Sequence, residues 1–439
     1  MVSAGPNRLG RRAFLAAAGA VVAVVGGSAC GFVPRRSAAG DPGALSFTTW
    51  GTEAELGAFR ELAAAFTREN PGTRVLINTA PYENFFTNID AQLQAGQAPD
   101  VFRVDYDTFG VYAGGQQLLD LGPHLPAGFG DRFTPAMWRA VRRGDRTFGV
   151  PHHTDTSVLL YNAEALRSAG ITDIPTTLDE AWTWERFEQV AVALRRALPP
   201  DRYPFAVNWQ LTGVTRWLSW LFEADGRVLA PDLRAPAVDS AAGRAALEFT
   251  QGFFRRGFVP PNSSVKSTTY ASDTWYGQTT AMTFGGAFLL PDADATLDFE
   301  WGATFAPRGV RGGGDLGGNA LVATAGTAKP ELAAAFLELV TREDPMRSFC
   351  VASSALPTRR DLVSGGLRFT ARPDLTPVFL GQATTVLPQD AEQVASPAMD
   401  AINAVLSDEL EEAFVGDRDT GATLAALSEG IAAATARTP

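Results

Sequence analysis

Apolar and polar positions alternate along the chain in blocks that have first the period of a strand and then that of a helix. An apolar run at residues 44–51 predicts a buried strand, and apolar side chains recur at helical spacing over residues 55–70. A strand at residues 73–81, a helix at 84–96 and a strand at 98–105 follow in the same way. Strands and helices that alternate with short connections predict parallel βαβ units in an α/β fold.

A second block of the same kind begins after residue 156. The pattern predicts strands at residues 157–162, 203–209, 280–286, 299–307 and 320–325. It predicts helices at residues 183–198, 214–225, 240–257, 330–341, 398–415 and 420–436, and Thr183 is placed to cap the first of them. The glycine-rich residues 308–319 match a dinucleotide-type Gly-x-Gly-x-x-Gly, but a strand follows where that site needs a helix. We therefore interpret them as a loop whose glycines allow close backbone approach.

The ends of the first strands are candidate ligand contacts. In open parallel sheets, ligands bind beyond the carboxyl ends of the strands. This rule selects the stretches 50–53 and 105–107, whose polar or aromatic members are Trp50, Glu53, Asp105 and Asp107.

Length and charge narrow the classes of protein. A chain of 439 residues is longer than one typical domain, so two lobes with separate cores are expected. The formal net charge of -11 argues against a nucleic-acid partner, because phosphate backbones require clustered Lys and Arg.

The N-terminal residues have the pattern of an export signal. Arg11 and Arg12 precede an apolar run at 13–25, which is shorter than the ~20 residues that a bilayer span needs. Residues 1–29 are therefore interpreted as a signal peptide that resembles the twin-arginine type, with an uncleaved anchor helix as the alternative. The sequence Gly-Ser-Ala-Cys ending at Cys30 resembles a bacterial lipobox, although Gly27 stands where that pattern has Leu, Ile or Val. Residues 30–43 would then tether a lipid-anchored protein outside the cytoplasmic membrane.

His152, His153 and Asp155 raise the question of a metal or catalytic site. Adjacent residues on a strand point to opposite faces, so the two histidines cannot easily bind one metal, and His124 is the only other histidine. No Gly-x-Ser-x-Gly nucleophile elbow is present. We therefore expect no metal, no cofactor and no catalytic residue, although spacing alone does not exclude a glycosidase pair of carboxylates such as Glu53 with Asp155 or Asp107.

Several short motifs occur in a familiar order. They are FTTWG (47–51), LQAGQAPDVFRVD (93–105), TFGVPHHTDTSVLLYNAEAL (147–166), TTLDEAWTWERFEQVAVAL (176–194), AMTFGGAF (281–288) and ALPTRRDL (355–362). Each motif is weak alone. Their joint order behind an export signal resembles the family 1 extracellular solute-binding proteins of ABC transporters, which are maltose-binding-protein-like and bind sugars.

The resemblance implies a two-lobed periplasmic-binding-protein-like fold of type II, with a ligand cleft between lobes joined by crossover segments. Carried over, the first lobe would comprise residues 44–152 with 315–352, and the second would comprise 156–310 with 358–439. The segments near Thr154 and at 312–314 would form the hinge, and Asp155 would offer a carboxylate to the cleft. Permease subunits in the membrane would be the protein partners of a monomeric binding protein.

The positions of several aromatic side chains favour a carbohydrate ligand. Trp217 and Trp220 are expected in the core, whereas Trp50 and Trp209 end predicted strands and Trp275 lies in a polar loop. A sugar offers an apolar face to a ring and hydroxyls to carboxylates and amides. The remaining expected contacts are Tyr82, Phe284, Gly286, Phe288 and Asn319, and Phe288 stands where maltose binders have Trp. An exported glycoside-acting enzyme and a binding protein for a polyamine-type cation are the alternatives.

Overall fold

The computed structural model describes residues 40–210 and 213–438. The predicted signal peptide, Cys30 and all but the last four residues of the predicted tether lie outside these ranges. The described residues belong to one compact unit, residues 36–439. Within them, no helix is both long and apolar enough to cross a bilayer.

The first sheet contains the predicted parallel βαβ units. Its strand order is β12-β6-β11-β3-β1-β2. β1 pairs in parallel with β2 and β3, whereas β11 is antiparallel to β3 and β6, and β12 is antiparallel to β6. The strands are β1 (Ala44–Thr49), β2 (Arg74–Thr79), β3 (Val101–Asp105), β6 (Val150–Asp155), β11 (Gly317–Ala323) and β12 (Leu356–Pro357).

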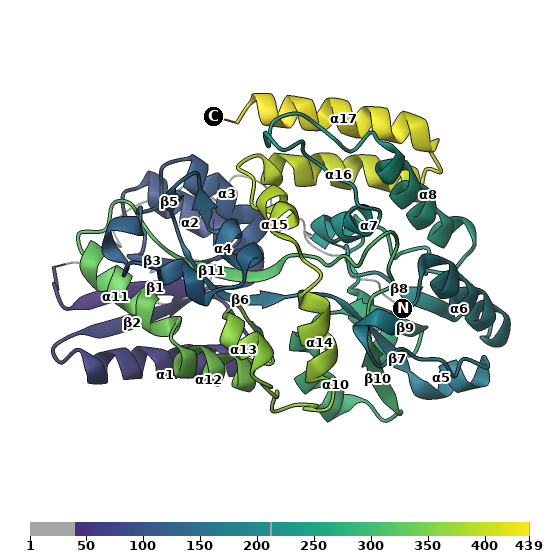
Figure 1. Cartoon of the computed structure of the whole chain (residues 1–439), viewed down its shortest axis with the longest axis horizontal. Helices are drawn as coiled ribbons and strands as arrows, with labels where there is room; N and C mark the ends of the chain where they lie inside the picture. The colour runs from purple at the N-terminus through teal and green to yellow at the C-terminus, as the bar shows by residue number, and fades with distance from the viewer. Residues whose placement is uncertain (1–39, 211–212, 439) are drawn as a thin grey trace, which may run out of the picture. The chain divides into compact units, whose positions relative to one another are not determined.

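The second sheet has the order β10-β7-β9-β8, with β8 and β9 parallel and the other pairs antiparallel. Its strands are β7 (Val158–Asn162), β8 (Tyr203–Ala206), β9 (Thr280–Gly285) and β10 (Trp301–Thr304), and a separate hairpin joins β4 (Arg142–Arg143) to β5 (Arg146–Thr147). The chain passes from the first sheet to the second between β6 and β7, and returns between β10 and β11 (Figure 1). The predicted crossing near Thr154 lies at the first of these passages.

Helices cover both faces of the first sheet. α1 (Glu53–Glu69), α11 (Pro330–Val340) and α12 (Glu343–Ser353) pack on one face, and α2 (Phe85–Gln94) and α3 (Tyr106–Gly114) lie on the other (Figure 1). α1 begins at Glu53 because Thr52 forms a capping box: its hydroxyl accepts from the Glu55 amide and its own amide donates to the Glu55 carboxylate. Leu45, Phe47 and Phe59 are among the fully buried residues of this core.

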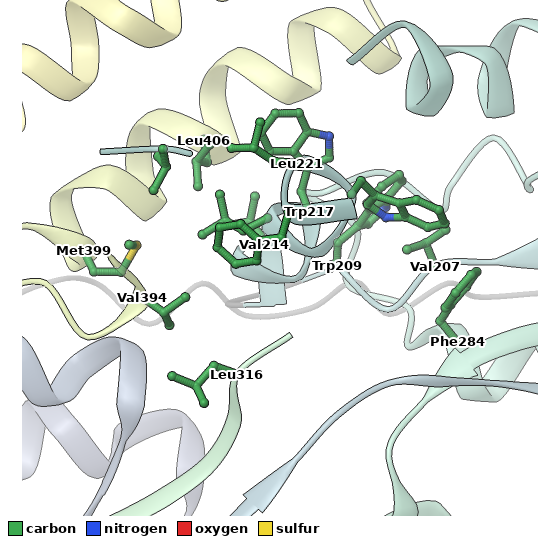
Figure 2. Packing of buried hydrophobic residues seen from close by; sticks show 14 of the residues in the cluster. Val207, Trp209, Val214, Trp217, Leu221, Phe284, Leu316, Val394, Met399 and Leu406 are labelled. Atoms are coloured by element: carbon green, nitrogen blue, oxygen red, sulfur yellow. The ribbon is translucent and has the colours of Figure 1, made fainter. Parts of the chain in front are cut away.

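A second hydrophobic cluster includes buried residues of α7 (Trp217–Glu223) and α8 (Ala241–Arg255). Figure 2 shows part of it, around Trp217 and Leu221 of α7. Trp217 and Trp220 are buried there, as expected from the sequence. Thr183 caps α6 (Trp184–Ala197) as predicted, because its hydroxyl accepts from the Arg186 amide. The other α-helices in the first half and middle of the described chain are α4 (Pro135–Ala140), α5 (Ala163–Ser168), α9 (Ala271–Tyr276) and α10 (Leu290–Thr296).

The C-terminal helices contact helices that pack near the first sheet as well as helices of the second cluster. α15 (Pro388–Val394) packs against α4, and α16 (Met399–Phe414) packs against α3 as well as α8 and α17 (Thr420–Ala436). α13 (Arg360–Ser364) and α14 (Thr376–Ala383) lie between them and β12 along the chain. The predicted boundaries assign residues 358–439 to the second lobe alone. The contacts of α15 with α4 and of α16 with α3 show that this segment also packs against helices next to the first sheet. The lobe boundaries themselves stay a prediction.

Candidate ligand-binding site

A cavity of about 550 Å³ lies where the two sheets face each other across the crossing segments. This volume is within the range of small-molecule sites in proteins. Its walls come from the ends of β1, β3 and β6, from the start of β11, from the β9 turn, and from the segment before α7. Eight of the residues predicted from the sequence line it: Trp50, Tyr82, Asp105, Asp107, Asp155, Phe284, Phe288 and Asn319.

Two predicted tryptophans belong to the core instead. β8 ends at Ala206, three residues before Trp209, so the Trp209 ring does not stand at the sheet edge. It is fully buried, stacks on Phe414 at 4.9 Å between ring centroids, and donates from Nε1 to the Ser263 carbonyl at 2.9 Å. Trp275 is also fully buried, because its segment folds as α9 and the ring packs edge-on against Phe299. Neither ring lines the cavity.

Glu53 and Gly286 lie beside the cavity without lining it. Glu53 is the first residue of α1, and its exposed side chain stands 3.9 Å from the guanidinium of Arg60. Gly286 lies behind Asp155: a Cβ at this position would be 2.3 Å from Asp155 Oδ2 and 2.5 Å from Oδ1. The glycine therefore allows the β9 turn to approach the crossing strand closely, and the Ala287 amide donates to Asp155 Oδ1 at 3.3 Å.

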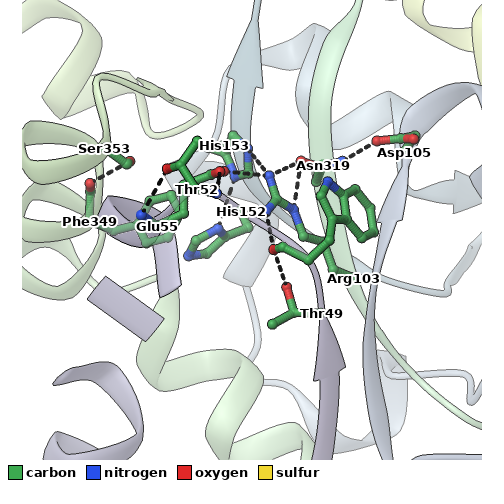
Figure 3. A network of polar contacts seen from close by, with 11 residues as sticks. Thr49, Thr52, Glu55, Arg103, Asp105, His152, His153, Asn319, Phe349 and Ser353 are labelled. Carbon is green, nitrogen blue, oxygen red and sulfur yellow. Dashed lines mark hydrogen bonds and ion pairs between the residues drawn. The ribbon is translucent and has the colours of Figure 1, made fainter. Parts of the chain in front are cut away.

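Arg103 is the centre of a polar network on the first-sheet side of the cavity (Figure 3). Its guanidinium donates to Asn319 Oδ1 at 2.8 and 2.6 Å, to the Trp50 carbonyl at 2.8 Å and to Glu55 Oε1 at 2.7 Å. Its Cζ also lies 4.5 Å from the centroid of the Trp50 ring. The Arg103 side chain is only 4% exposed, so this network fixes Trp50 and Asn319 in place before any ligand arrives.

Asp105 extends this network towards the cavity. Its carboxylate accepts from the Tyr82 hydroxyl at 2.8 Å and from the Asn319 amide. Burial, together with the neighbouring Asp107 carboxylate, raises the pKa of Asp105 to about 7. The two hydrogen bonds act in the opposite direction and favour the ionised form.

The two histidines adjoin the network around Arg103. His153 lines the cavity and its Nε2 lies 3.2 Å from Arg103 Nη2, while its Nδ1 is 3.1 Å from His152 Nδ1. His152 is fully buried and packs edge-on against Phe349. Burial lowers the pKa of both imidazoles well below the ordinary value, so both are neutral at pH 7. Over the residues that the structure describes, no three or more His, Cys, Asp or Glu side chains gather in a way that could hold a metal ion.

A second polar group lies at the crossing between the sheets. Asp315 accepts from the Ser157 amide at 2.6 Å and from the Ser157 hydroxyl at 3.1 Å, and forms an ion pair with Arg216 Nε at 3.3 Å. Asn208 donates to the Ser157 hydroxyl at 2.8 Å. These contacts join the two crossing segments to each other, because Ser157 follows β6 and Asp315 precedes β11.

Asp155 lies between these two groups. Within the described residues, the donors to its side chain are two backbone amides, those of Ala287 and Thr156. Burial and the nearby Asp315 carboxylate raise the pKa of Asp155 to about 7, and Arg216 acts in the opposite direction.

Sequence reasoning missed several lining residues. The sequence position of Arg103 indicates a buried polar network, because a charged side chain within an otherwise apolar strand must find partners when the strand is buried. Arg216, Asn208, Gln210 and Tyr270 lie in loops or helix starts, where no local pattern marked them. Three aromatic side chains on the cavity wall keep much of their surface in solvent: Tyr82 (39%), Phe288 (46%) and Tyr270 (47%).

The comparison with known proteins gives the same family that the sequence motifs resemble. The model of the bacterial extracellular solute-binding protein family matches residues 50–347, which is more than half of the chain. An uncharacterised lipoprotein from the oleD 5′ region of Streptomyces antibioticus is 26% identical over 335 residues, covering 72% of this chain and 70% of that protein. An arabinooligosaccharide-binding protein of Bacillus subtilis is 24% identical over 141 residues, which is 31% of each chain.

A solved structure supports the fold. The GacH receptor of Streptomyces glaucescens GLA.O, solved unliganded and with acarbose, matches at a TM-score of 0.72 and 18% identity. The match covers 90% of this chain and 99% of that one. The predicted two-lobed α/β fold of the type II periplasmic binding proteins is therefore confirmed. The chain belongs to the family of bacterial extracellular solute-binding proteins.

Proposed function

We propose that the protein is the extracytoplasmic binding component of an ABC importer and that it binds a carbohydrate in the cavity between the two sheets. One observation carries this proposal. The same cavity wall presents half-exposed aromatic rings (Tyr82, Tyr270 and Phe288) and the hydrogen-bonding groups of Asp107, Asp155 and Asn208. A sugar needs both, because its ring has an apolar face and a rim of hydroxyls.

The relatives favour the same ligand class. The Bacillus subtilis relative is named for binding arabinooligosaccharides, and the GacH receptor structure holds acarbose. In this protein, the ligand contacts would be Trp50, Tyr82, Asp105, Asp107, Asp155, Phe284, Phe288 and Asn319 from the sequence prediction, with Arg216, Asn208 and Tyr270 added from the cavity wall.

Binding would be tested by a thermal-shift screen of sugars and polyamines, followed by calorimetry. A ligand at about 100 times its Kd adds about 2.7 kcal/mol of stability, which a thermal shift detects easily. Asp155→Ala should weaken binding of the selected sugar by about 1–3 kcal/mol, because its partners would be left unpaired. Asp294→Ala is the matched control, since Asp294 is an exposed carboxylate in α10 and does not line the cavity. Stabilisation by polyamines alone would contradict the carbohydrate proposal.

The mechanism would be closure without catalysis. Trp50 and Asp105 lie at the carboxyl ends of strands in the first sheet, and Phe284 and Phe288 lie at or just after the end of β9 in the second sheet. A sugar in the cavity would therefore contact both sheets and favour the conformation in which they are closer together. Small-angle scattering should show a smaller radius of gyration at saturation. An unchanged radius would contradict closure, and the release of a hydrolysis product seen by mass spectrometry would contradict the absence of catalysis.

The location would be the outer face of the cytoplasmic membrane. The basis is the twin-arginine-like signal at 1–29 and the lipobox-like Cys30, both outside the described residues, and the relative in Streptomyces antibioticus is a lipoprotein. Cys30→Ala should release the monomeric protein from the membrane fraction. A wild-type protein that is already found in the soluble fraction would contradict lipidation.

A further inference from the structure

The charges on the cavity wall are strongly unequal. Among the described lining residues, two carry guanidinium groups, Arg103 and Arg216, and His153 is neutral. Six lining residues carry carboxylates: Glu55, Glu83, Asp105, Asp107, Asp155 and Asp315. The cavity is therefore negative overall and repels anionic ligands, which disfavours uronic acids and sugar phosphates.

Four of these carboxylates already have compensation. Glu55 is paired with Arg103 at 2.7 Å, and Asp315 with Arg216 at 3.3 Å and with two Ser157 donors. Asp105 accepts from a phenol and an amide, and Glu83 is exposed to solvent.

The remaining two, Asp107 and Asp155, have neutral donors, which include the backbone amides of Thr108 for Asp107 and of Thr156 for Asp155. Thr108 and Asn403 approach the Asp107 carboxylate at 3.4 and 3.5 Å, and the Ala287 amide approaches Asp155 at 3.3 Å. These neutral contacts are longer than the 2.7–2.9 Å typical of charge-assisted hydrogen bonds. Neither carboxylate forms an ion pair within the described residues, and both are partly buried. Arg216, the cation that acts on both, is already paired with Asp315.

We propose that the carbohydrate ligand carries a protonated amino group, so that it is an amino sugar, and that Asp107 and Asp155 bind that ammonium group. This inference rests on the proposed function and names its substrate class. A neutral sugar would leave both carboxyl groups without a cationic partner, whereas an ammonium group supplies one and favours their ionised forms. The exposed rings of Tyr270 and Phe288 favour the same ligand, because aromatic faces accept both sugar rings and cations.

Matched pairs of sugars would test the proposal. Each pair consists of a free amino sugar and the neutral sugar with a hydroxyl at the same carbon: glucosamine with glucose, galactosamine with galactose, and β-1,4-linked glucosamine oligomers with cello-oligosaccharides. The N-acetylated forms are a third, uncharged member. Calorimetry should show that at least one amino member binds at least about tenfold more tightly than both neutral members. That preference should shrink when salt is raised from about 0.05 to about 0.5 M.

Isosteric variants separate charge from shape. Asp107→Asn and Asp155→Asn keep an oxygen acceptor but remove the charge, so each should reduce the ratio of amino-sugar to neutral-sugar affinity towards one. Asp294→Asn should leave the ratio unchanged.

The outcomes are distinguishable. Equal or tighter binding of every neutral member, or no binding by either member of any pair, would overturn the amino-sugar inference. Neutral-sugar binding would leave the carbohydrate proposal intact. Binding of spermidine or putrescine without any sugar would overturn both.

Discussion

The two polar groups on the cavity wall differ in how completely their charges are paired. Around Arg103, every direction of the guanidinium meets an acceptor or a ring: Asn319, Glu55, the Trp50 carbonyl and the Trp50 indole. At the crossing, Arg216 is shared among acidic neighbours, and Asp155 accepts from neutral backbone amides, that of Ala287 at 3.3 Å and that of Thr156. The first group has the contacts of a structural network. The second group has carboxylate oxygens that can still accept hydrogen bonds from a ligand.

This difference separates residues that shape the site from residues that bind in it. A fully satisfied buried network is costly to break, because removal of one partner leaves the others desolvated and unpaired. A carboxylate with few partners already carries that cost in the ligand-free protein. Substitution at such a position should change binding more than it lowers stability.

The largest expected effect is the loss of Arg103. Arg103→Met should lower the free energy of unfolding by about 3–5 kcal/mol, because Glu55 and Asn319 would remain buried without their partner. Urea denaturation measures this change. Arg60→Met is the control on α1, where an exposed pair at 3.9 Å should contribute about 0–1 kcal/mol. Equal effects of the two variants would contradict the view that the contacts around Arg103 form a structural network.

Much of the fold could be predicted because the hydrophobic pattern is local. The period of apolar residues in the first block fixed the order of β1, α1, β2, α2 and β3, and the strand-end rule then put Trp50, Asp105 and Asp107 on the cavity. The partners of Arg103 could not be found in this way. Asn319 lies 216 residues away in sequence, and only the pairing of β11 with β3 brings the two together.

The errors have a physical cause too. An indole gives the same apolar signal whether it faces a core or a cavity, so the prediction for Trp209 depended on where β8 ends. The strand ends at Ala206, and the chain then turns Trp209 towards Phe414. The polar neighbours of Trp275 predict a loop, yet that segment forms a short helix with one buried face.

The next effect concerns the close approach of the β9 turn to Asp155. Gly286→Ala should destabilise the protein by about 1–3 kcal/mol and weaken ligand binding, because the new Cβ would displace the Asp155 carboxylate. Gly326→Ala should be nearly neutral, since a Cβ there meets nothing within 4 Å. Urea denaturation and calorimetry with the sugar from the screen measure the two effects. Unchanged stability and affinity in Gly286→Ala would mean that Asp155 is free to move.

The pH dependence of stability should report the incomplete pairing of Asp155. Its folded-state pKa of about 7 exceeds the ordinary 3.8, so between these values the folded protein holds a proton that the unfolded chain has released. Ionisation therefore destabilises the wild type as pH rises through this window, whereas Asn does not titrate. Asp155→Asn should be more stable relative to wild type at pH 8 than at pH 4.5, by about 1–2 kcal/mol after allowance for partial exposure. A difference that is constant with pH would contradict this.

The smallest effect tests whether Asp105 belongs to the well-paired group. Tyr82→Phe removes one of its two side-chain donors but leaves the Asn319 amide and the ring contact with Trp50. The expected loss of stability is about 0.5–1.5 kcal/mol, and the pKa of Asp105 should rise further because the phenol favours the ionised form. Urea denaturation at several pH values measures both, with Tyr270→Phe as a stability control on the opposite wall. If Tyr82→Phe left stability unchanged at every pH, the hydrogen bond would contribute nothing, and Asp105 would join Asp107 and Asp155 among the carboxylates available to a ligand.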